Sequence, residues 1–389
     1  MSTAIKICYV TTVSLTFKTS LIEQIRYMHA KGMDITVVFS RDDDYLKIFP
    51  PGVKYHPITL ARGNDLLGSV ATLFNLYAFF RKEQFDIVQY TTPNASLCAA
   101  LAAKWAGVPA RVFSQWGLRY VGFNGVRRSL YKWLERLTCR YSTHIRPDSH
   151  GNLRFAIAEG LYPAEKGAVI WNGSARGVDM GKFDYTKKSI WRHEVRAQLH
   201  IDEATFVYGY IGRFMRDKGT NELLAAYRRI IKLQCDTILL MVGTTELEET
   251  LDISLIEWAK QSSSVVFVNY TTEAEKYFSA CDVSLLPSYR EGFGNTVIEA
   301  EAVGIPVIVS DIPGPTDAVI PRETGLVVNK QDVDDLYYAM HYLLEHRDIC
   351  VRMGEAAHAF VRNSFEQQAY FKHVLADKMH IYSQSRKRQ

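Results

Sequence analysis

The sequence predicts an α/β protein that contains two parallel sheets, each in its own domain. Short apolar runs of strand length alternate with longer stretches of helical periodicity along the chain, and this alternation is typical of parallel sheets joined by crossover helices. The chain has 389 residues, more than one hydrophobic core usually serves. A glycine-rich segment without either periodicity, residues 171–188, interrupts the alternation. We therefore expect a domain boundary in this segment.

The first half of the chain alternates strand-like and helix-like stretches. The strand-like runs are rich in β-branched and aromatic residues, whereas the helix-like stretches carry apolar residues at spacings of three and four. The predicted strands cover residues 6–10, 34–39, 86–90 and 110–113, and the predicted helices cover residues 20–31, 66–83 and 97–106.

The second half repeats this alternation. Its strand-like runs are bounded by glycine, proline or polar residues, and its helix-like stretches are apolar on one face. The predicted strands cover residues 206–212, 237–243, 265–268, 283–286 and 306–309, and the predicted helices cover residues 221–233, 333–346 and 367–383, with a further helix from Asn295. We expect a first domain at 1–175, a second at 176–365, and a C-terminal segment at 366–389.

The composition indicates a globular protein in a reducing compartment. Hydrophobic residues make up 47% of the chain and charged residues 23%, which excludes intrinsic disorder. The six cysteines lie singly, without a CxxC pair or a Cys/His cluster that would suggest structural zinc. Residues 1–13 are too polar for a signal peptide, and no apolar run reaches about eighteen residues. We therefore expect a cytoplasmic location without a membrane-spanning helix.

A glycine loop that opens a predicted helix is the most informative segment. Gly292 and Gly294 permit a tight turn and a close approach of the backbone to a ligand, and the free amides of a first helical turn attract phosphate. Glu291 precedes the helix and Glu299 lies just beyond its first turn, so the two carboxylates can bind different ends of one ligand, such as a sugar and a ribose. The segment reads Ser288-Tyr289-Arg290-Glu291-Gly292-Phe293-Gly294-Asn295-Thr296-Val297-Ile298-Glu299.

A second cluster of charges follows the predicted strand at 206–212. Arg213, Arg216 and Lys218 lie between this strand and the next predicted helix. Cations at a helix N-terminus oppose the helix dipole, so a structural role explains them poorly unless an anion lies among them. A diphosphate would be such an anion. The alternative is an ion pair between Arg216 and Asp217, with the other two cations in solvent.

These two segments resemble the signature of family 4 glycosyltransferases, the retaining enzymes with the GT-B fold. In that family two glutamates are separated by seven residues, as Glu291 and Glu299 are here, and an arginine and a lysine at the positions of Arg213 and Lys218 hold the nucleotide diphosphate. The resemblance implies two Rossmann-like domains that face each other across a cleft, with the C-terminal helix packed back on the first domain. It implies catalytic roles for Glu291, Arg213 and Lys218. The donor-binding residues that it implies are Gly292, Phe293, Gly294, Asn295, Thr296 and Glu299.

The first domain departs from the family pattern at two loops. Residues 11–18, after the first strand, contain no glycine, although many family members have a glycine-rich loop there. After the strand at 110–113 the chain has Ser114-Gln115-Trp116-Gly117, where many relatives carry a histidine before a glycine. A base or donor-stabilising residue in this domain is therefore not assigned. We expect Ser14, Gln115 and Trp116 to contact the acceptor.

A basic stretch with helical periodicity lies between Lys104 and Glu159. It holds ten lysines and arginines against three acids, in a chain whose net charge is only +4. A basic amphipathic helix of this kind suits an anionic inner leaflet and an acceptor on a polyprenyl diphosphate, and the aromatic-rich segment 73–82 can add to it. Alternatively, the apolar stripe is an ordinary core face. No nucleic-acid-binding motif accompanies the charge. The apolar positions are Val126, Leu130, Trp133, Leu134, Leu137 and Tyr141, opposite Arg127, Arg128, Lys132, Arg136 and Arg140.

We therefore expect a retaining glycosyltransferase that acts in bacterial surface polysaccharide synthesis. It would move a sugar from a nucleotide diphosphate, which we expect to be UDP, to a hydroxyl of a lipid-linked saccharide. The Asp-x-Asp pairs within Asp42-Asp43-Asp44 and Asp332-Val333-Asp334-Asp335 are candidates for a metal site. These aspartates are more simply explained as charged residues of a loop and of a first helical turn. In addition, Arg213 and Lys218 can neutralise the diphosphate without a metal. We expect no metal.

Three other functions compete with this one. A dinucleotide enzyme would have the same sheets, but the loop at residues 11–18 lacks the glycines that pyrophosphate requires. An epimerase or a phosphorylase-like enzyme would share the phosphate site. A catalytically silent sugar-nucleotide-binding protein would share the whole donor site.

Overall fold

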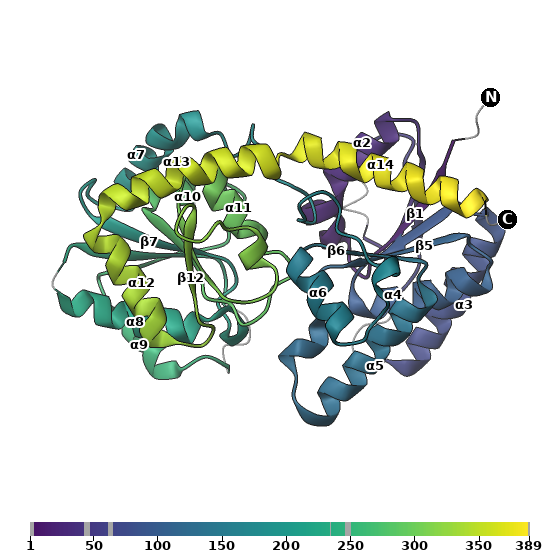
Figure 1. Cartoon of the computed structure of the whole chain (residues 1–389), viewed down its shortest axis with the longest axis horizontal. Helices are drawn as coiled ribbons and strands as arrows, with labels where there is room; N and C mark the ends of the chain where they lie inside the picture. The colour runs from purple at the N-terminus through teal and green to yellow at the C-terminus, as the bar shows by residue number, and fades with distance from the viewer. Residues whose placement is uncertain (1–3, 43–46, 61–64, 234, 246–249, 388–389) are drawn as a thin grey trace. The chain divides into compact units, whose positions relative to one another are not determined.

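The computed structural model describes residues 4–42, 47–60, 65–233, 235–245 and 250–387. Two compact units share the chain (Figure 1). The first domain contains Met1–Arg176 together with Gln368–Gln389, and the second contains Gly177–Gln367. The bounds expected from the sequence lie within two residues of these divisions.

The first domain is built on a parallel six-stranded sheet in the order β3-β2-β1-β4-β5-β6. Because β1 pairs with both β2 and β4, the chain reverses its direction across the sheet between β1 and β4. Ligands of such folds bind where this reversal occurs, beyond the carboxyl ends of the strands. The strands are β1 (Lys6–Val10), β2 (Asp34–Phe39), β3 (Lys54–Pro57), β4 (Ile87–Tyr90), β5 (Ala110–Gln115) and β6 (His144–Pro147).

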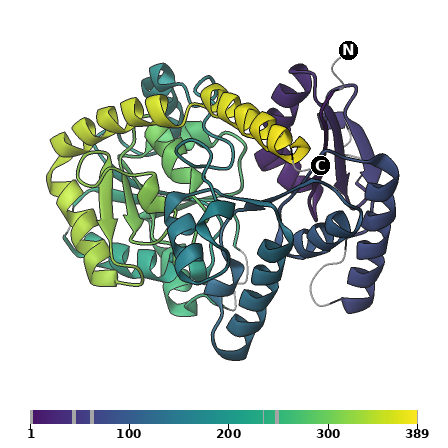
Figure 2. The same ribbon diagram turned by 45° about the vertical axis from the view of Figure 1, so that its right-hand side comes forward.

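Helices cover both faces of this sheet. Strand residues alternate between two cores: Cys8 and Val10 pack toward α3 to α6, whereas Ile7 and Tyr9 pack toward α2 and α14. In Figures 1 and 2 the yellow helix α14 lies along this domain beside α2. The helices are α1 (Ser14–Thr16), α2 (Ile22–Ala30), α3 (Leu66–Glu83), α4 (Pro93–Trp105), α5 (Gly125–Tyr141), α6 (His150–Ala158) and α14 (Gln367–Arg386).

The second domain repeats the design with the order β12-β11-β10-β7-β8-β9, again parallel. Here the reversal lies between β10 and β7. The strands are β7 (Phe206–Ile211), β8 (Thr237–Val242), β9 (Val265–Val268), β10 (Val283–Leu286), β11 (Val307–Ser310) and β12 (Gly325–Val328).

The second sheet also lies between two hydrophobic cores. Tyr208 and Met241 pack toward α8, α9 and α12, whereas Val207 and Leu240 pack toward α7, α10 and α11. Residues of α13 contribute to both cores. The helices are α7 (Lys188–Gln198), α8 (Thr220–Ile230), α9 (Ile253–Gln261), α10 (Ala274–Ala280), α11 (Asn295–Ala302), α12 (Val333–Glu345) and α13 (Arg347–Ser364).

The predicted parallel α/β architecture is confirmed, but three of the four edge strands were not predicted. Strands β3 and β12 form one edge of each sheet, and β6 forms the other edge of the first sheet. Each is only four residues long. Strand β3 is lysine, tyrosine, histidine and proline, without the apolar run of a central strand. Edge strands require neither two buried faces nor a long apolar run, and so they give a weak signal in the sequence.

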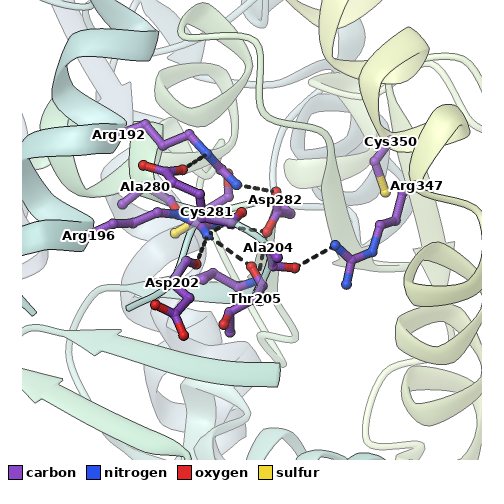
Figure 3. A network of polar contacts seen from close by, with 12 residues as sticks. Arg192, Arg196, Asp202, Ala204, Thr205, Ala280, Cys281, Asp282, Arg347 and Cys350 are labelled. Atoms are coloured by element: carbon purple, nitrogen blue, oxygen red, sulfur yellow. Dashed lines mark hydrogen bonds and ion pairs between the residues drawn. The ribbon is translucent and has the colours of Figure 1, made fainter. Parts of the chain in front are cut away.

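A buried arginine connects α7, through hydrogen bonds and an ion pair, to segments next to the strands of the second domain (Figure 3). The side chain of Arg196 is only 1% exposed. Its Nη2 lies 2.9 Å from Oδ2 of Asp282, which also accepts a hydrogen bond from the amide of Val207. The guanidinium therefore links α7 to the segments that lead into β7 and β10. Its remaining hydrogen bonds go to the carbonyl oxygens of Ala280, Asp202, Glu203 and Thr205.

Helix α11 contains a fully buried carboxyl group, that of Glu301. The side chain of Glu301 is fully buried, and neither of its oxygens has a hydrogen-bond partner among the described residues. Burial raises the pKa of Glu301 well above its ordinary value, and the nearby hydroxyl of Thr324 offsets only part of this rise. The folded protein therefore retains a proton that the unfolded chain releases.

We predict that Glu301→Gln stabilises the protein increasingly as the pH rises. The pKa of Glu301 is higher in the folded state than in the unfolded state. Between these two pKa values the wild-type protein therefore loses roughly 1.4 kcal/mol of stability for each unit by which the pH rises. Urea unfolding of both proteins from pH 4 to pH 8 measures this difference. Glu355→Gln, which changes an exposed glutamate of α13, is the control. A stability difference that does not grow with pH contradicts the prediction.

Candidate functional site

The two predicted ligand-binding segments of the second domain meet at the point where its chain direction reverses. Strand β7 leads into Arg213 and Lys218, and its neighbour β10 leads into the loop that holds Glu291. Both loops therefore leave the carboxyl edge of the sheet side by side, at the position where parallel α/β sheets bind their ligands.

Close contact between these two loops depends on a glycine. Gly219 adopts φ +73°, and a Cβ atom at this position would lie 2.0 Å from the carbonyl oxygen of Pro287. Only glycine fits such a backbone, both because of its conformation and because of the contact. The neighbouring residue, Lys218, is thereby held beside the loop after β10.

The structure brings Lys218 and Glu291 together. Nζ of Lys218 lies 2.5 Å from Oε1 of Glu291, which also accepts a hydrogen bond from the hydroxyl of Ser288 at 2.8 Å. The two side chains are 20% and 13% exposed, so the pair is largely shielded but still reachable. A lysine ammonium has three donors, and this contact uses one of them. The other two can donate to an anion.

The glycine loop shapes the N-terminus of α11 for a ligand. Gly294 precedes the helix with φ +83° and offers no side chain that would cap it. Gly314 approaches so closely that a Cβ there would lie 2.1 Å from the carbonyl oxygen of Gly292. Phe293 is buried against Phe365 and anchors the loop. The amides of Asn295 and Thr296 therefore begin a helix whose dipole favours negative charge at this end.

The other acidic groups near the cationic loop already have partners. Asp217 forms an ion pair with Arg290 at 2.6 Å, rather than with Arg216, which was the structural alternative. Glu222 accepts a hydrogen bond from the hydroxyl of Tyr289 at 2.6 Å. On the other side of the loop, the hydroxyl of Tyr210 donates to the carbonyl oxygen of Arg213 at 2.8 Å. These contacts hold the loop in place, and they pair its carboxylate, Asp217, with Arg290 instead of with a cation of the loop.

Comparison with known proteins identifies the family to which this arrangement belongs. A model described as "Glycosyl transferase 4-like domain" matches residues 19–173, and one described as "Glycosyl transferases group 1" matches residues 192–360. The capsular polysaccharide biosynthesis glycosyltransferase CapM of Staphylococcus aureus is 29% identical over 345 residues, which cover 89% of each chain. The chain is a GT-B glycosyltransferase of the family 4 type.

This glycosyltransferase is also similar to other known proteins. The UDP-Gal:alpha-D-GlcNAc-diphosphoundecaprenol alpha-1,3-galactosyltransferase of Escherichia coli is 27% identical over 306 residues, which cover 77% of this chain and 75% of that one. The crystal structure of the Anabaena protein HepE in complex with UDP has a TM-score of 0.77 at 18% identity, and covers 97% of this chain and 100% of that one. The second likeness shows the fold alone.

In the first domain of the glycosyltransferase, Gln115 takes part in a buried hydrogen-bond network. Its side chain is fully buried; Nε2 donates to Glu135 at 2.7 Å, and Oε1 accepts from the hydroxyl of Tyr162 at 3.0 Å. Burial raises the pKa of Glu135 to about 7. Gln115 therefore has a structural role, and its expected contact with an acceptor stays a prediction.

The other two predicted acceptor residues follow different strands of the first sheet, β1 and β5. Ser14 is buried, and its hydroxyl donates to Oδ2 of Asp42 at 2.6 Å, beyond β1. Trp116 is half-buried and lines a small polar cavity beneath α14, together with Arg146 and Lys378. Contacts of Ser14 and Trp116 with an acceptor stay predictions.

Sequence analysis missed a strained residue at the reversal point of the first sheet. Thr92, which follows β4, adopts φ +73°, a conformation rare for a β-branched residue. Its hydroxyl lies 2.6 Å from that of Thr12, beyond β1. Strain of this kind collects at functional sites, but no residue pattern reveals it because threonine is an ordinary residue before a helix.

The candidate metal-binding aspartates serve as helix and loop contacts where the structure describes them. Asp332 caps α12 by accepting a hydrogen bond from the amide of Asp335 at 3.0 Å. Asp334 pairs with Arg229, and Asp335 accepts a hydrogen bond from the amide of Asn329. Asp43 and Asp44 lie outside the described residues, whereas Asp42 contacts Ser14.

Proposed function

We propose that this glycosyltransferase transfers a sugar, with retention of anomeric configuration, from a UDP-sugar to a hydroxyl of a lipid-linked saccharide in bacterial surface polysaccharide synthesis. The observation that carries the proposal is the contact between Lys218 and Glu291 beside the N-terminus of α11. A sugar diphosphate bound there would meet a cation, a carboxylate and the amides of the helix N-terminus. The name of the Escherichia coli galactosyltransferase, which gives a diphosphoundecaprenol-linked acceptor, supports the acceptor class, and that of CapM supports a role in surface polysaccharide synthesis.

In this proposal the second domain binds the donor. Arg213, Lys218 and the amides of Asn295 and Thr296 hold the diphosphate, and Glu299 binds the ribose diol. Glu291 binds sugar hydroxyls and favours positive charge at the anomeric carbon. The bond between that carbon and the phosphate oxygen breaks as the acceptor oxygen bonds to the same face, and the departing phosphate takes the acceptor's proton. The cations stabilise the negative charge that develops on UDP.

No metal has a role in this proposal. The cations of the second domain already neutralise the leaving group, which is what a metal would otherwise do. The expected consequence is full activity in EDTA.

We further propose that α5 brings the enzyme to the inner face of the cytoplasmic membrane. Val126, Leu130 and Trp133 are 85%, 52% and 54% exposed, so this part of the apolar stripe does not face the core. Only Thr138 and Cys139, near the end of the helix, are buried. Exposed apolar residues beside a basic face are typical of helices that lie in an anionic interface. No helix in the described ranges has the length and apolar content to span a bilayer.

We predict that replacing Val126, Leu130 and Trp133 by serine lowers binding to phosphatidylglycerol vesicles at least about tenfold, because each large apolar side chain contributes roughly 1.5–3 kcal/mol on full burial. Vesicle co-sedimentation measures the binding. The control replaces three exposed apolar residues of the second domain, Ile190, Ile253 and Val351, by serine. Equal binding by both triple variants contradicts a role for α5.

One assay separates the proposed function from its alternatives. The protein is incubated in EDTA with radiolabelled nucleotide sugars and with saccharides on polyprenyl diphosphate. Transfer from a UDP-sugar with the anomeric configuration retained supports the proposal. Product without acceptor indicates an epimerase, and nucleotide binding without any turnover indicates a silent binding protein. Strict dependence on a divalent metal contradicts the proposed leaving-group stabilisation.

A further inference from the structure

We propose that Arg119 binds the diphosphate of the lipid-linked acceptor. This inference rests on the proposed acceptor class and adds a specific residue and a specific ligand group to it. Arg119 begins the short 3-10 helix η3 (Arg119–Gly122), four residues after the carboxyl end of β5.

Aromatic rings hold the guanidinium of Arg119 in place. Its Cζ lies 4.6 Å from the centre of the Tyr131 ring and 6.0 Å from that of Phe123. These two rings stack on each other at 4.8 Å with an interplanar angle of 18°. A guanidinium stacks through its face, whereas its N–H donors lie in its plane. The stacking therefore orients Arg119 without using its hydrogen-bond donors.

Two of the neighbouring cations share a carboxylate. Glu159 lies 2.7 Å from Nζ of Lys132 and 3.5 Å from Nη2 of Arg128, and it accepts a hydrogen bond from the hydroxyl of Tyr120. Within the described ranges no carboxylate pairs with Arg119, which is only half-buried. A fixed, accessible and unneutralised guanidinium matches the bidentate geometry of phosphate oxygens.

The position of Arg119 favours the acceptor's diphosphate over other anions. The nucleotide diphosphate has its own cations, Arg213 and Lys218, in the second domain. In a polyprenyl-linked acceptor the diphosphate lies at the membrane interface, between the buried chain and the saccharide. Arg119 contacts Tyr131 of α5, the helix whose exposed stripe is proposed to lie in that interface. The acceptor's diphosphate and the guanidinium are therefore both expected beside α5.

The test uses water-soluble ligands, so that membrane attachment does not contribute. One ligand carries the saccharide on a short alkyl diphosphate, and the other carries it on an uncharged alkyl chain. Arg119→Gln is expected to weaken binding of the diphosphate ligand, and to raise its KM, roughly 10- to 100-fold, as expected for a lost charge-assisted contact. Binding of the uncharged ligand and the KM for the UDP-sugar should not change.

Three variants control this experiment. Arg386→Gln removes the same charge from the exposed end of α14 and should bind like wild type. Tyr131→Phe keeps the stacked ring, whereas Tyr131→Leu removes it and should lose part of the affinity for the diphosphate ligand. Thermal unfolding of each variant shows whether it is folded.

The outcomes separate the two proposals. Equal affinity of wild type and Arg119→Gln for the diphosphate ligand overturns the role of Arg119. An equal loss for both ligands overturns it as well, since the effect then is not specific to the diphosphate. A loss seen only with phosphatidylglycerol vesicles assigns Arg119 to the bilayer headgroups instead. If wild type transfers sugar to neither ligand yet binds the diphosphate ligand through Arg119, the proposed reaction fails while this binding site stands.

Discussion

Lys218→Met is expected to lower kcat about 10²- to 10³-fold, as the loss of a key donor to a developing negative charge does in other enzymes. The variant retains most of the length of the side chain but removes the charge that lies 2.5 Å from Glu291. Two effects then combine: the departing diphosphate loses a cation, and Glu291 loses the partner that orients it. Steady-state kinetics with the UDP-sugar and a saturating acceptor measure the change.

The matched control is Lys232→Met, which removes an exposed lysine from the same domain. It should behave like wild type. If Lys218→Met retains wild-type kcat and KM, Lys218 does not stabilise the leaving group, whatever its position in the structure.

Arg196→Ala should produce the largest loss of stability. The side chain is 1% exposed and its guanidinium donates to four carbonyl oxygens and to Asp282. Removing one partner of a buried ion pair typically costs about 3–5 kcal/mol, because the other charge stays buried without compensation. Among the described residues, Asp282 then keeps its contacts with the amide of Val207 and with Arg192. Urea unfolding measures the loss.

Two further variants are needed to interpret that result. Arg196→Lys keeps the charge but cannot reproduce the planar fork, so it should be destabilised to an intermediate degree. Arg352→Ala, which changes an exposed arginine of α13, should unfold like wild type within about 0.5 kcal/mol. A loss below about 1 kcal/mol for Arg196→Ala would show that the network is not a major source of stability.

The parallel α/β fold could be predicted because the central strands are buried on both faces and therefore read as continuous apolar runs. Strands β1, β2 and β10 have the predicted bounds, and so does β9, an edge strand whose sequence, Val-Val-Phe-Val, is a continuous apolar run. Edge strands such as β3 are short and polar, and their pairing depends on neighbours distant in sequence. Periodicity within a segment therefore could not reveal them.

The candidate donor site was predicted as two separate segments, but the contact between these segments was not predicted. The contact between Lys218 and Glu291 spans 73 residues of sequence, and it depends on the close approach at Gly219. Sequence also left open whether the apolar stripe of α5 faces the core; the exposure of Val126 and Trp133 answers this for the first half of the helix. Burial of Gln115 and strain at Thr92 depend on tertiary packing, which local patterns do not encode.

The central claim is that the second domain binds the diphosphate of an activated sugar between the loop after β7 and the N-terminus of α11. A crystal structure of the protein soaked with UDP tests it most directly. We predict that the phosphate oxygens lie within hydrogen-bond distance of the Arg213 guanidinium, of Nζ of Lys218 and of an amide at Asn295 or Thr296, with Glu299 on the ribose. Nucleotide bound elsewhere, or phosphates that contact neither cation, would contradict the account.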